Sequence, residues 1–136
     1  MAMDTKIVVV LREDLPPGQA ANAGAVLGLA LGGRLEHSVA ADGKDAGGRV
    51  HAGLNPHPVP TLTATGERLR EIKEEAEDRG LLVVGFNEVA RRSRDYVAYL
   101  DALADTAPEE VEYTGLALLG ARGEVNKLTK RLPLLR

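Results

Sequence analysis

The chain has 136 residues, of which 44% are hydrophobic and 27% are charged, and its formal net charge is −3. These values predict one globular domain over residues 1–136 with a full hydrophobic core. The absence of cysteine excludes disulfides, thiolate metal sites and cysteine nucleophiles. Nucleic acid is not expected as a partner, because the net charge is negative and an aromatic content of 3% provides few stacking platforms.

The N-terminal residues and the apolar stretches bear on localisation. No basic region followed by an apolar segment opens the chain, so no secretory signal is expected. The apolar run at 23–31 is too short to span a bilayer. We therefore expect a cytoplasmic protein with no membrane partner.

The first three dozen residues predict a strand, a loop and a helix. Residues 6–11 form a continuous apolar run typical of a strand buried on both faces, 12–18 form a polar turn, and 19–31 form an alanine-rich helical stretch. A helix that begins beside the carboxyl end of a strand directs free N–H groups at whatever lies above that sheet edge. We therefore expect a small anionic or carbonyl ligand to bind at this helix start.

Three residues at the helix start are candidate ligand contacts. Gly18 permits close backbone approach, and Gln19 and Asn22 offer side-chain amides. In the alternative interpretation, Gly18 serves only the turn and Asn22 bonds to nearby backbone.

Residues 32–60 form an irregular segment rich in Gly, Pro, His and Asp. We expect short strands near 36–40 and 59–63, with turns at 42–43 and 46–48.

Histidines in or beside this segment provide a second set of candidates. They are His37, His51 and His57. Their spacing matches no zinc signature, so no metal site is expected. His51 is a candidate pocket residue.

The second half of the chain alternates predicted helices and strands. Thr65 is expected to cap a helix at 66–79 that ends on Gly80, with an apolar stripe formed by Leu69, Ile72 and Ala76. The following expectations are a strand at 81–86, a helix or helix pair capped by Asn87, a strand at 111–119, a turn at 120–123, and a helix at 124–132 stopped by Pro133. Alternation of this kind predicts an α/β fold with helices on both faces of a sheet.

Glycines recur at Gly24, Gly28 and Gly32 of the first predicted helix. Because each internal glycine costs a helix about 0.8–1 kcal/mol relative to alanine, we expect close packing on the sheet or on a neighbouring helix, with a homodimer contact as the alternative. No Walker loop, Gly-x-Gly-x-x-Gly or Gly-x-Ser-x-Gly motif is present, so no nucleotide cofactor is expected.

Two families share motifs with the chain. Arg12-x-Asp14-Leu15, a glycine-containing loop and Ala20-Ala21-Asn22 resemble the class II peptidyl-tRNA hydrolases, in which Arg-x-Asp-Leu precedes Gly-Lys-x-Ala-Ala-Gln. Residues 15–23, 51–54, 56–60 and 125–136 resemble the uncharacterised domain-of-unknown-function 2000 family, which is grouped in the peptidyl-tRNA hydrolase II-like superfamily. The resemblance implies a three-layer α/β/α sandwich with a four-stranded mixed sheet.

The chain departs from the hydrolases where their chemistry requires a cation. The position of the catalytic lysine falls on Gly18, and nothing in 104–113 resembles their Asp-Ala-Gly-x-Thr stretch. We therefore favour a non-catalytic or weakly catalytic binding module.

Its candidate ligand contacts are Asp14, Gly18, Gln19 and Asn22, with His51, Asn126 and Lys127 at the rim. The alternatives are a hydrolase in which His51 or Lys127 replaces the missing lysine, and an interaction module that works as a dimer.

Overall fold

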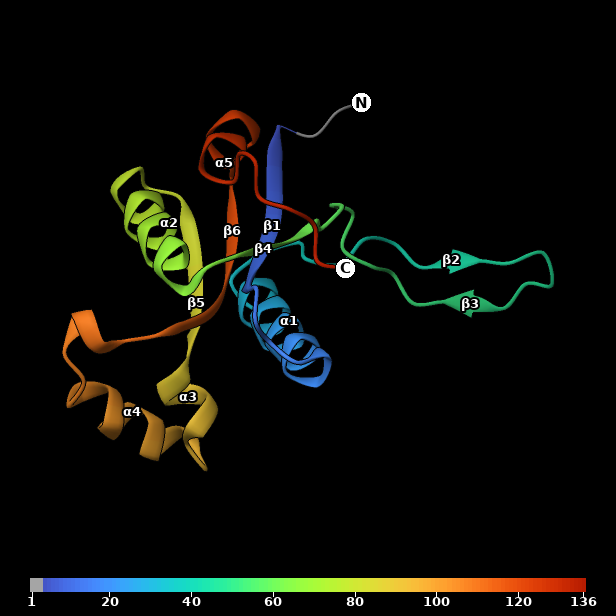
Figure 1. The fold of residues 1–136 in the computed structure, drawn as a ribbon. Coiled ribbons are helices and arrows are strands. Elements are labelled where there is room, and N and C mark those ends of the chain that lie inside the picture. The colour runs from blue at the N-terminus through green and yellow to red at the C-terminus, as the bar shows by residue number, and fades with distance from the viewer. Residues whose placement is uncertain (1–3) are drawn as a thin grey trace.

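The computed structural model describes residues 4–136, and Figure 1 shows the arrangement of its helices and strands. In chain order the elements are β1 (Thr5–Arg12), α1 (Pro17–Gly32), β2 (Gly43–Lys44), β3 (Val50–His51), β4 (Thr61–Ala64), α2 (Gly66–Asp78), β5 (Leu82–Asn87), α3 (Glu88–Arg92), α4 (Tyr96–Ala104), the 3₁₀ turn η1 (Pro108–Glu110), β6 (Tyr113–Ala121) and α5 (Arg122–Leu128). Among these residues no helix has the length and apolar character needed to cross a membrane.

Four strands form the mixed sheet that the resemblance implies. Their order is β4-β1-β6-β5; β1 runs parallel to β4 and antiparallel to β6, and β5 is antiparallel to β6. The carboxyl ends of β1, β4 and β5 therefore lie at one edge of the sheet, together with the amino end of β6. We call this edge the upper edge; in Figure 1 it lies toward the bottom of the view, where β1 leads into α1.

The apolar run of β1 is buried on both faces of the sheet, as its composition predicts. Val8 and Val10 pack in a cluster with residues of α2 and α5, whereas Val9 and Leu11 pack in a cluster with residues of α1. Helices thus cover both faces, and the predicted α/β fold is confirmed in three layers (Figure 1).

Three predicted helix-end residues have the roles expected of them. Thr65 accepts a hydrogen bond from the backbone N–H of Arg68, and Asn87 accepts one from that of Ala90. Gly80 follows α2 with φ +72°, a conformation that favours glycine.

The segment between α1 and β4 differs from its prediction. Residues 36–40 form no strand, and Gly43 belongs to β2 rather than to a turn. Instead β2 and β3 pair with each other in a separate two-stranded sheet, and residues 46–48 make the turn between them. We call residues 40–54 the arm; Figure 1 shows that it projects well beyond the four-stranded sheet.

The C-terminal elements also differ from their prediction. The expected turn at 120–123 is absent, because β6 continues to Ala121 and α5 begins at the next residue. A Cβ at Gly120 would lie 2.5 Å from a methyl carbon of Leu81, so a larger residue there would require the Leu81 side chain to move. The closing helix ends at Leu128 rather than 132, and the last residues pair with the outer side of β4 through a Leu62–Leu134 bridge.

The expectation of close packing at the glycines of α1 is wrong. Among residues 4–136, and apart from the backbone of α1 itself, no atom lies within 4 Å of a Cβ added at Gly24, Gly28 or Gly32. The side of α1 that contacts the sheet instead consists of Ala20, Ala23, Leu27 and Leu31. The glycines therefore leave open space along one side of the helix.

Candidate functional site at the upper sheet edge

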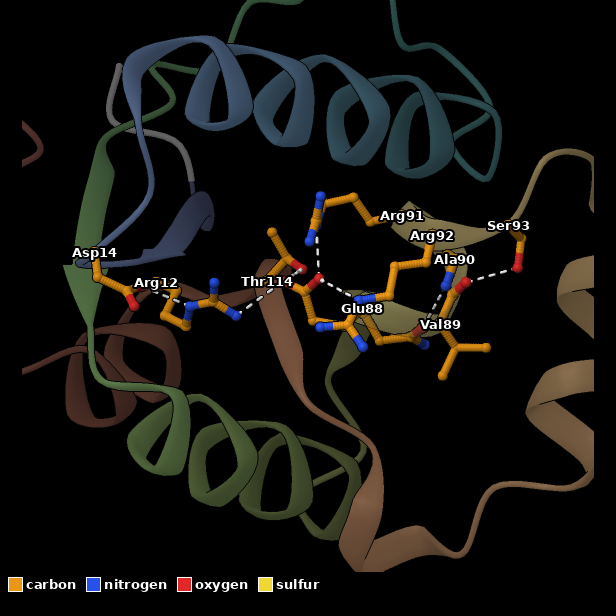
Figure 2. A network of polar contacts seen from close by, with 10 residues as sticks. Arg12, Asp14, Glu88, Val89, Ala90, Arg91, Arg92, Ser93 and Thr114 are labelled. Atoms are coloured by element: carbon orange, nitrogen blue, oxygen red, sulfur yellow. Dashed lines mark hydrogen bonds and ion pairs between the residues drawn. The ribbon is translucent and has the colours of Figure 1, made fainter.

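The upper edge holds a nearly buried carboxylate surrounded by arginines. Glu88, the first residue of α3, is 5% exposed. Its carboxylate accepts hydrogen bonds from Arg12 Nη1 at 3.0 Å, from Arg91 Nε at 2.6 Å and from Thr114 Oγ1 at 3.4 Å. Figure 2 shows this network between α1 and α2. The network connects the ends of β1 and β5 to the start of β6.

The electrostatics of the network favour the ionised form of Glu88. Burial alone would raise its pKa, but the hydrogen bonds and charges of Arg91 and Arg12 outweigh burial, so the pKa lies below its ordinary value. Because Arg12 and Arg91 both form ion pairs with Glu88, their positive charges are largely neutralised. The cluster therefore holds the strand ends together rather than attracting an anion.

Asp14 lies beside this cluster. Its carboxylate accepts a hydrogen bond from Arg12 Nε at 2.6 Å, which lowers the pKa of Asp14 and raises that of Arg12. The Arg-x-Asp spacing therefore makes a local ion pair across the strand end. Since the Asp14 side chain is 70% exposed, it remains accessible to solvent.

The first turn of α1 lacks a side-chain cap. Its N-cap is Pro16, the first helical residue is Pro17, and no acidic residue lies in the first turn. The N–H of Ala20 bonds to the carbonyl of Pro16, which leaves the N–H groups of Gly18 and Gln19 as the donors without an intrahelical acceptor. Gly18 is exposed and Gln19 is half-buried.

A cleft of about 640 Å³ adjoins this turn. It lies between the side of α1, the start of β4 and the C-terminal residues, and its lining is mainly apolar. The lining residues are Leu11, Leu15, Pro17, Ala20, Ala21, Gly24, Thr61, Leu135 and Arg136. A cleft of this size can hold a small organic molecule.

A second cleft lies farther along α1, beyond Gly24. The second cleft has a volume of about 370 Å³, and its lining includes Gly28, Gly32, Val9 and Val59. The three glycines therefore border two successive clefts on the same side of the helix. The absence of their side chains leaves the space that these clefts occupy.

The structure does not gather all of the predicted contacts at α1. His51 lies on the arm, where Nε2 is 2.9 Å from Oδ2 of Asp45, and not at the sheet edge as expected. Asn126 and Lys127 are exposed on α5, which follows the carboxyl end of β6 and thus lies at the opposite edge. The side-chain Oδ1 of Asn126 accepts a hydrogen bond from Lys6 near the start of β1.

Two candidate residues escaped the sequence analysis, Glu88 at the upper edge and Arg136 beside the start of β4. Glu88 follows a strand directly, and its Glu-x-x-Arg spacing with Arg91 was a usable signal, but nothing in the sequence links it to Arg12, which is 76 positions away. Arg136 joins the cleft only because the C-terminal residues return to β4.

No group of three His, Cys, Asp or Glu side chains within residues 4–136 is placed to hold a metal ion.

Known proteins place the chain in a family. Its fold is similar to the solved structure of Atu0240, a protein of unknown function from Agrobacterium tumefaciens strain C58, with a TM-score of 0.90, 26% sequence identity, and coverage of 99% of this chain and 100% of that one. Residues 5–136 match the family described as Protein of unknown function (DUF2000), so the chain belongs to that family. No protein with a curated description matches the chain.

Proposed function

We propose that the chain is a binding protein for a small ligand that has one anionic group, a carboxylate or phosphate, and an apolar body. The observation that carries this proposal is the 640 Å³ cleft beside the uncapped first turn of α1. The N–H groups of Gly18 and Gln19 and the positive end of the helix dipole favour an anion at that turn.

The cleft lining supports the two-part character of the ligand. Leu11, Leu15 and Leu135 supply apolar surface, and Arg136 is the charged residue of the lining. Its side chain makes no hydrogen bond or ion pair with residues 4–136, so the guanidinium is available to a bound anion. A ligand that spans the helix start and Arg136 would use both sources of positive charge.

The proposed fold relationship is with the peptidyl-tRNA hydrolase II-like superfamily, through Arg12-x-Asp14-Leu15 and the small-residue helix that follows. Glycine stands where the hydrolase lysine would be, and neither His51 nor Lys127 lies near the start of α1 to replace it. This arrangement favours binding over hydrolysis. We therefore expect no turnover of N-blocked aminoacyl-tRNA in an assay beside a class II hydrolase. Turnover comparable to that enzyme, abolished by changing His51 or Lys127, would contradict the proposal.

Calorimetric titration with inorganic phosphate and with a medium-chain fatty carboxylate tests the binding function. The carboxylate should bind more tightly than phosphate, because only it fills the apolar part of the cleft. Arg136→Gln should weaken the binding of both probes by about tenfold, a value typical of one lost charged hydrogen bond. Asn22→Ala should weaken the binding of both probes by a smaller factor.

Arg94→Gln is the matched control. Its side chain is 90% exposed and lies outside the cleft lining, so it tests for a general loss of positive charge. Equal losses in Arg94→Gln and Arg136→Gln, or no saturable binding of either probe, would contradict the proposal.

A further inference from the structure

Most of the aromatic side chains of this protein lie at a third cleft. The sequence has one phenylalanine, three tyrosines and no tryptophan. Phe86 of β5 and both tyrosines of α4, Tyr96 and Tyr99, line a cleft of about 420 Å³ between α1, β5 and the α3–α4 segment. The two clefts along α1 described above have no Phe, Tyr or Trp in their lining. The third cleft therefore has a distinct chemical character.

The two tyrosines do not belong to the hydrophobic core. None of the nine residues of α4 is buried, and Tyr96 is 71% exposed. The two rings lie edge to face, with 5.4 Å between their centroids. Their hydroxyls form no hydrogen bond with residues 4–136. The pair thus presents aromatic surface and two free hydroxyls at the cleft, and aromatic surface of this kind favours a further ring in an offset or edge-to-face contact.

Arg34 supplies positive charge to the same cleft. It follows the end of α1 and belongs to the cleft lining. Its Nη1 donates to the carbonyl of Ala30 at 2.7 Å, which leaves its charge uncompensated, and the guanidinium forms no ion pair with residues 4–136. A guanidinium has five N–H donors, so those that remain can hold a carboxylate.

Asp95 is the carboxylate of the lining, and it already has partners. Its Oδ1 accepts a hydrogen bond from the backbone N–H of Ala98 at 2.8 Å, and its Oδ2 lies 3.7 Å from Arg94 Nε. The positive end of the α4 dipole compensates its charge further. A cage for an organic cation needs aromatic rings without a competing positive charge. Uncompensated charge at Arg34 favours an anion instead.

We propose that this cleft binds an aromatic carboxylate, whose ring contacts the three aromatic side chains and whose carboxylate is held by Arg34. The opposite wall consists of Val26, Leu27 and Ala30 of α1, which offers apolar contact to the ring. A volume of 420 Å³ is near the lower end of the range for small-molecule sites, about 300–1,000 Å³, and suits one ring with a short chain. The site is separate from the cleft at the start of α1 and does not depend on ligand binding there.

Two carboxylates that differ only in their ring test the recognition of an aromatic group. The probes are 3-phenylpropionate and 3-cyclohexylpropionate, titrated into the ¹⁵N-labelled chain. Amide shifts of Tyr96 and Tyr99 report this cleft, and those of Gly18 and Gln19 report the other. At Tyr96 and Tyr99 the phenyl probe should bind about two- to tenfold more tightly, a gain typical of aromatic contacts, although the saturated ring is more apolar. Equal or tighter binding of the cyclohexyl probe, or no saturable shift at the tyrosines, would overturn the proposal.

Variants separate the contributions of the ring contacts and of the charge. Tyr99→Leu should abolish the preference for the phenyl probe, and Tyr99→Phe should retain it, because only the latter keeps a ring. Arg34→Gln should weaken 3-phenylpropionate about tenfold but leave the neutral 3-phenylpropionamide unchanged. Arg49→Gln is the matched control, since Arg49 is an exposed arginine of the arm outside the cleft lining. An equal loss in Arg49→Gln, an undiminished affinity in Arg34→Gln, or an equal loss for the amide would refute the assigned role of Arg34.

Discussion

α1 and α2 cover opposite faces of one sheet, yet their outward sides are of opposite kinds. Nine of the 13 residues of α2 are charged, whereas none of the 16 residues of α1 is. α2 also begins with a Thr65 cap and has Glu67 in its first turn. α1 follows Pro16 and has neither a side-chain cap nor an acidic residue in its first turn. α2 is thus complete as a solvent-exposed helix. α1 has N–H groups without an acceptor at its start and an outward side without charge, and we assign ligand binding to its start.

The inward sides of the two helices should contribute equally to stability. Truncating a buried leucine on either one should have the largest effect on the free energy of unfolding. Leu27 of α1 and Leu69 of α2 are both fully buried. Leu27→Ala and Leu69→Ala should each lower the free energy of unfolding by about 2–5 kcal/mol, because each leaves a cavity in the core. Urea unfolding followed by circular dichroism measures both. A negligible cost for Leu27→Ala alone would show that α1 is not packed on the sheet as described.

The Glu88 network between the two helices gives the next effect. Glu88→Ala should cost about 2–4 kcal/mol, somewhat below the loss for a fully buried ion pair because Arg12 and Arg91 keep partial solvent contact.

The network also has a pH signature. The pKa of Glu88 is lower in the folded chain than its ordinary value, so its stabilising contribution is present above about pH 4.5 and is lost as the pH falls through the folded-state pKa. In unfolding measurements between pH 7 and pH 3, Glu88→Gln should therefore lose less stability on acidification than the unchanged chain. Parallel pH profiles would show that the Glu88 charge does not stabilise the edge.

The sequence predicted most of the sheet and much less of the site, for reasons visible in particular residues. Local signals such as the Thr65 cap, the Gly80 stop and the apolar run of β1 act over a few positions, and the structure has them as predicted. Contacts between distant positions carry no such signal. Arg12 meets Glu88 only because the sheet places the ends of β1 and β5 at the same edge. Lys127 is far from the start of α1 because β6 runs antiparallel to β1 and carries α5 to the opposite edge.

Glycine was the most ambiguous residue type in the sequence. Gly53 is required by a close backbone approach, Gly120 lies against a leucine side chain that a larger residue would displace, and a Cβ at Gly28 would meet no neighbour within 4 Å among residues 4–136. The amino-acid letter is the same in each case, and only the surroundings in the fold separate these roles.

Helix capping gives a smaller effect that differs between the helices. Thr65→Ala should cost about 1 kcal/mol, because the Arg68 N–H loses its acceptor. Pro16→Ala removes no side-chain hydrogen bond from α1, so its cost of about 0.4–1 kcal/mol should come only from the greater freedom of the unfolded chain. Thermal unfolding of the two variants measures both costs. A loss well above about 1 kcal/mol in Pro16→Ala would mean that the start of α1 has a cap that the described contacts do not include.

The open space beside Gly28 gives the smallest expected effect. Gly28→Ala should raise the free energy of unfolding by about 0.5–1 kcal/mol, because alanine favours the helix and the added Cβ meets nothing within 4 Å. Urea unfolding at low protein concentration measures it. A destabilised variant would show that the space is already filled.

The most direct test of the account is a titration of the ¹⁵N-labelled chain with phosphate, followed by amide chemical shifts at the two helix starts. Gly18 and Gln19 of α1 should shift and saturate together, because their N–H groups have no acceptor. Arg68 of α2, whose N–H already donates to Thr65, and Glu67, whose carboxylate repels an anion, should hardly move. Equal shifts at both helix starts, or none at Gly18 and Gln19, would contradict the claim that the start of α1 is a binding site.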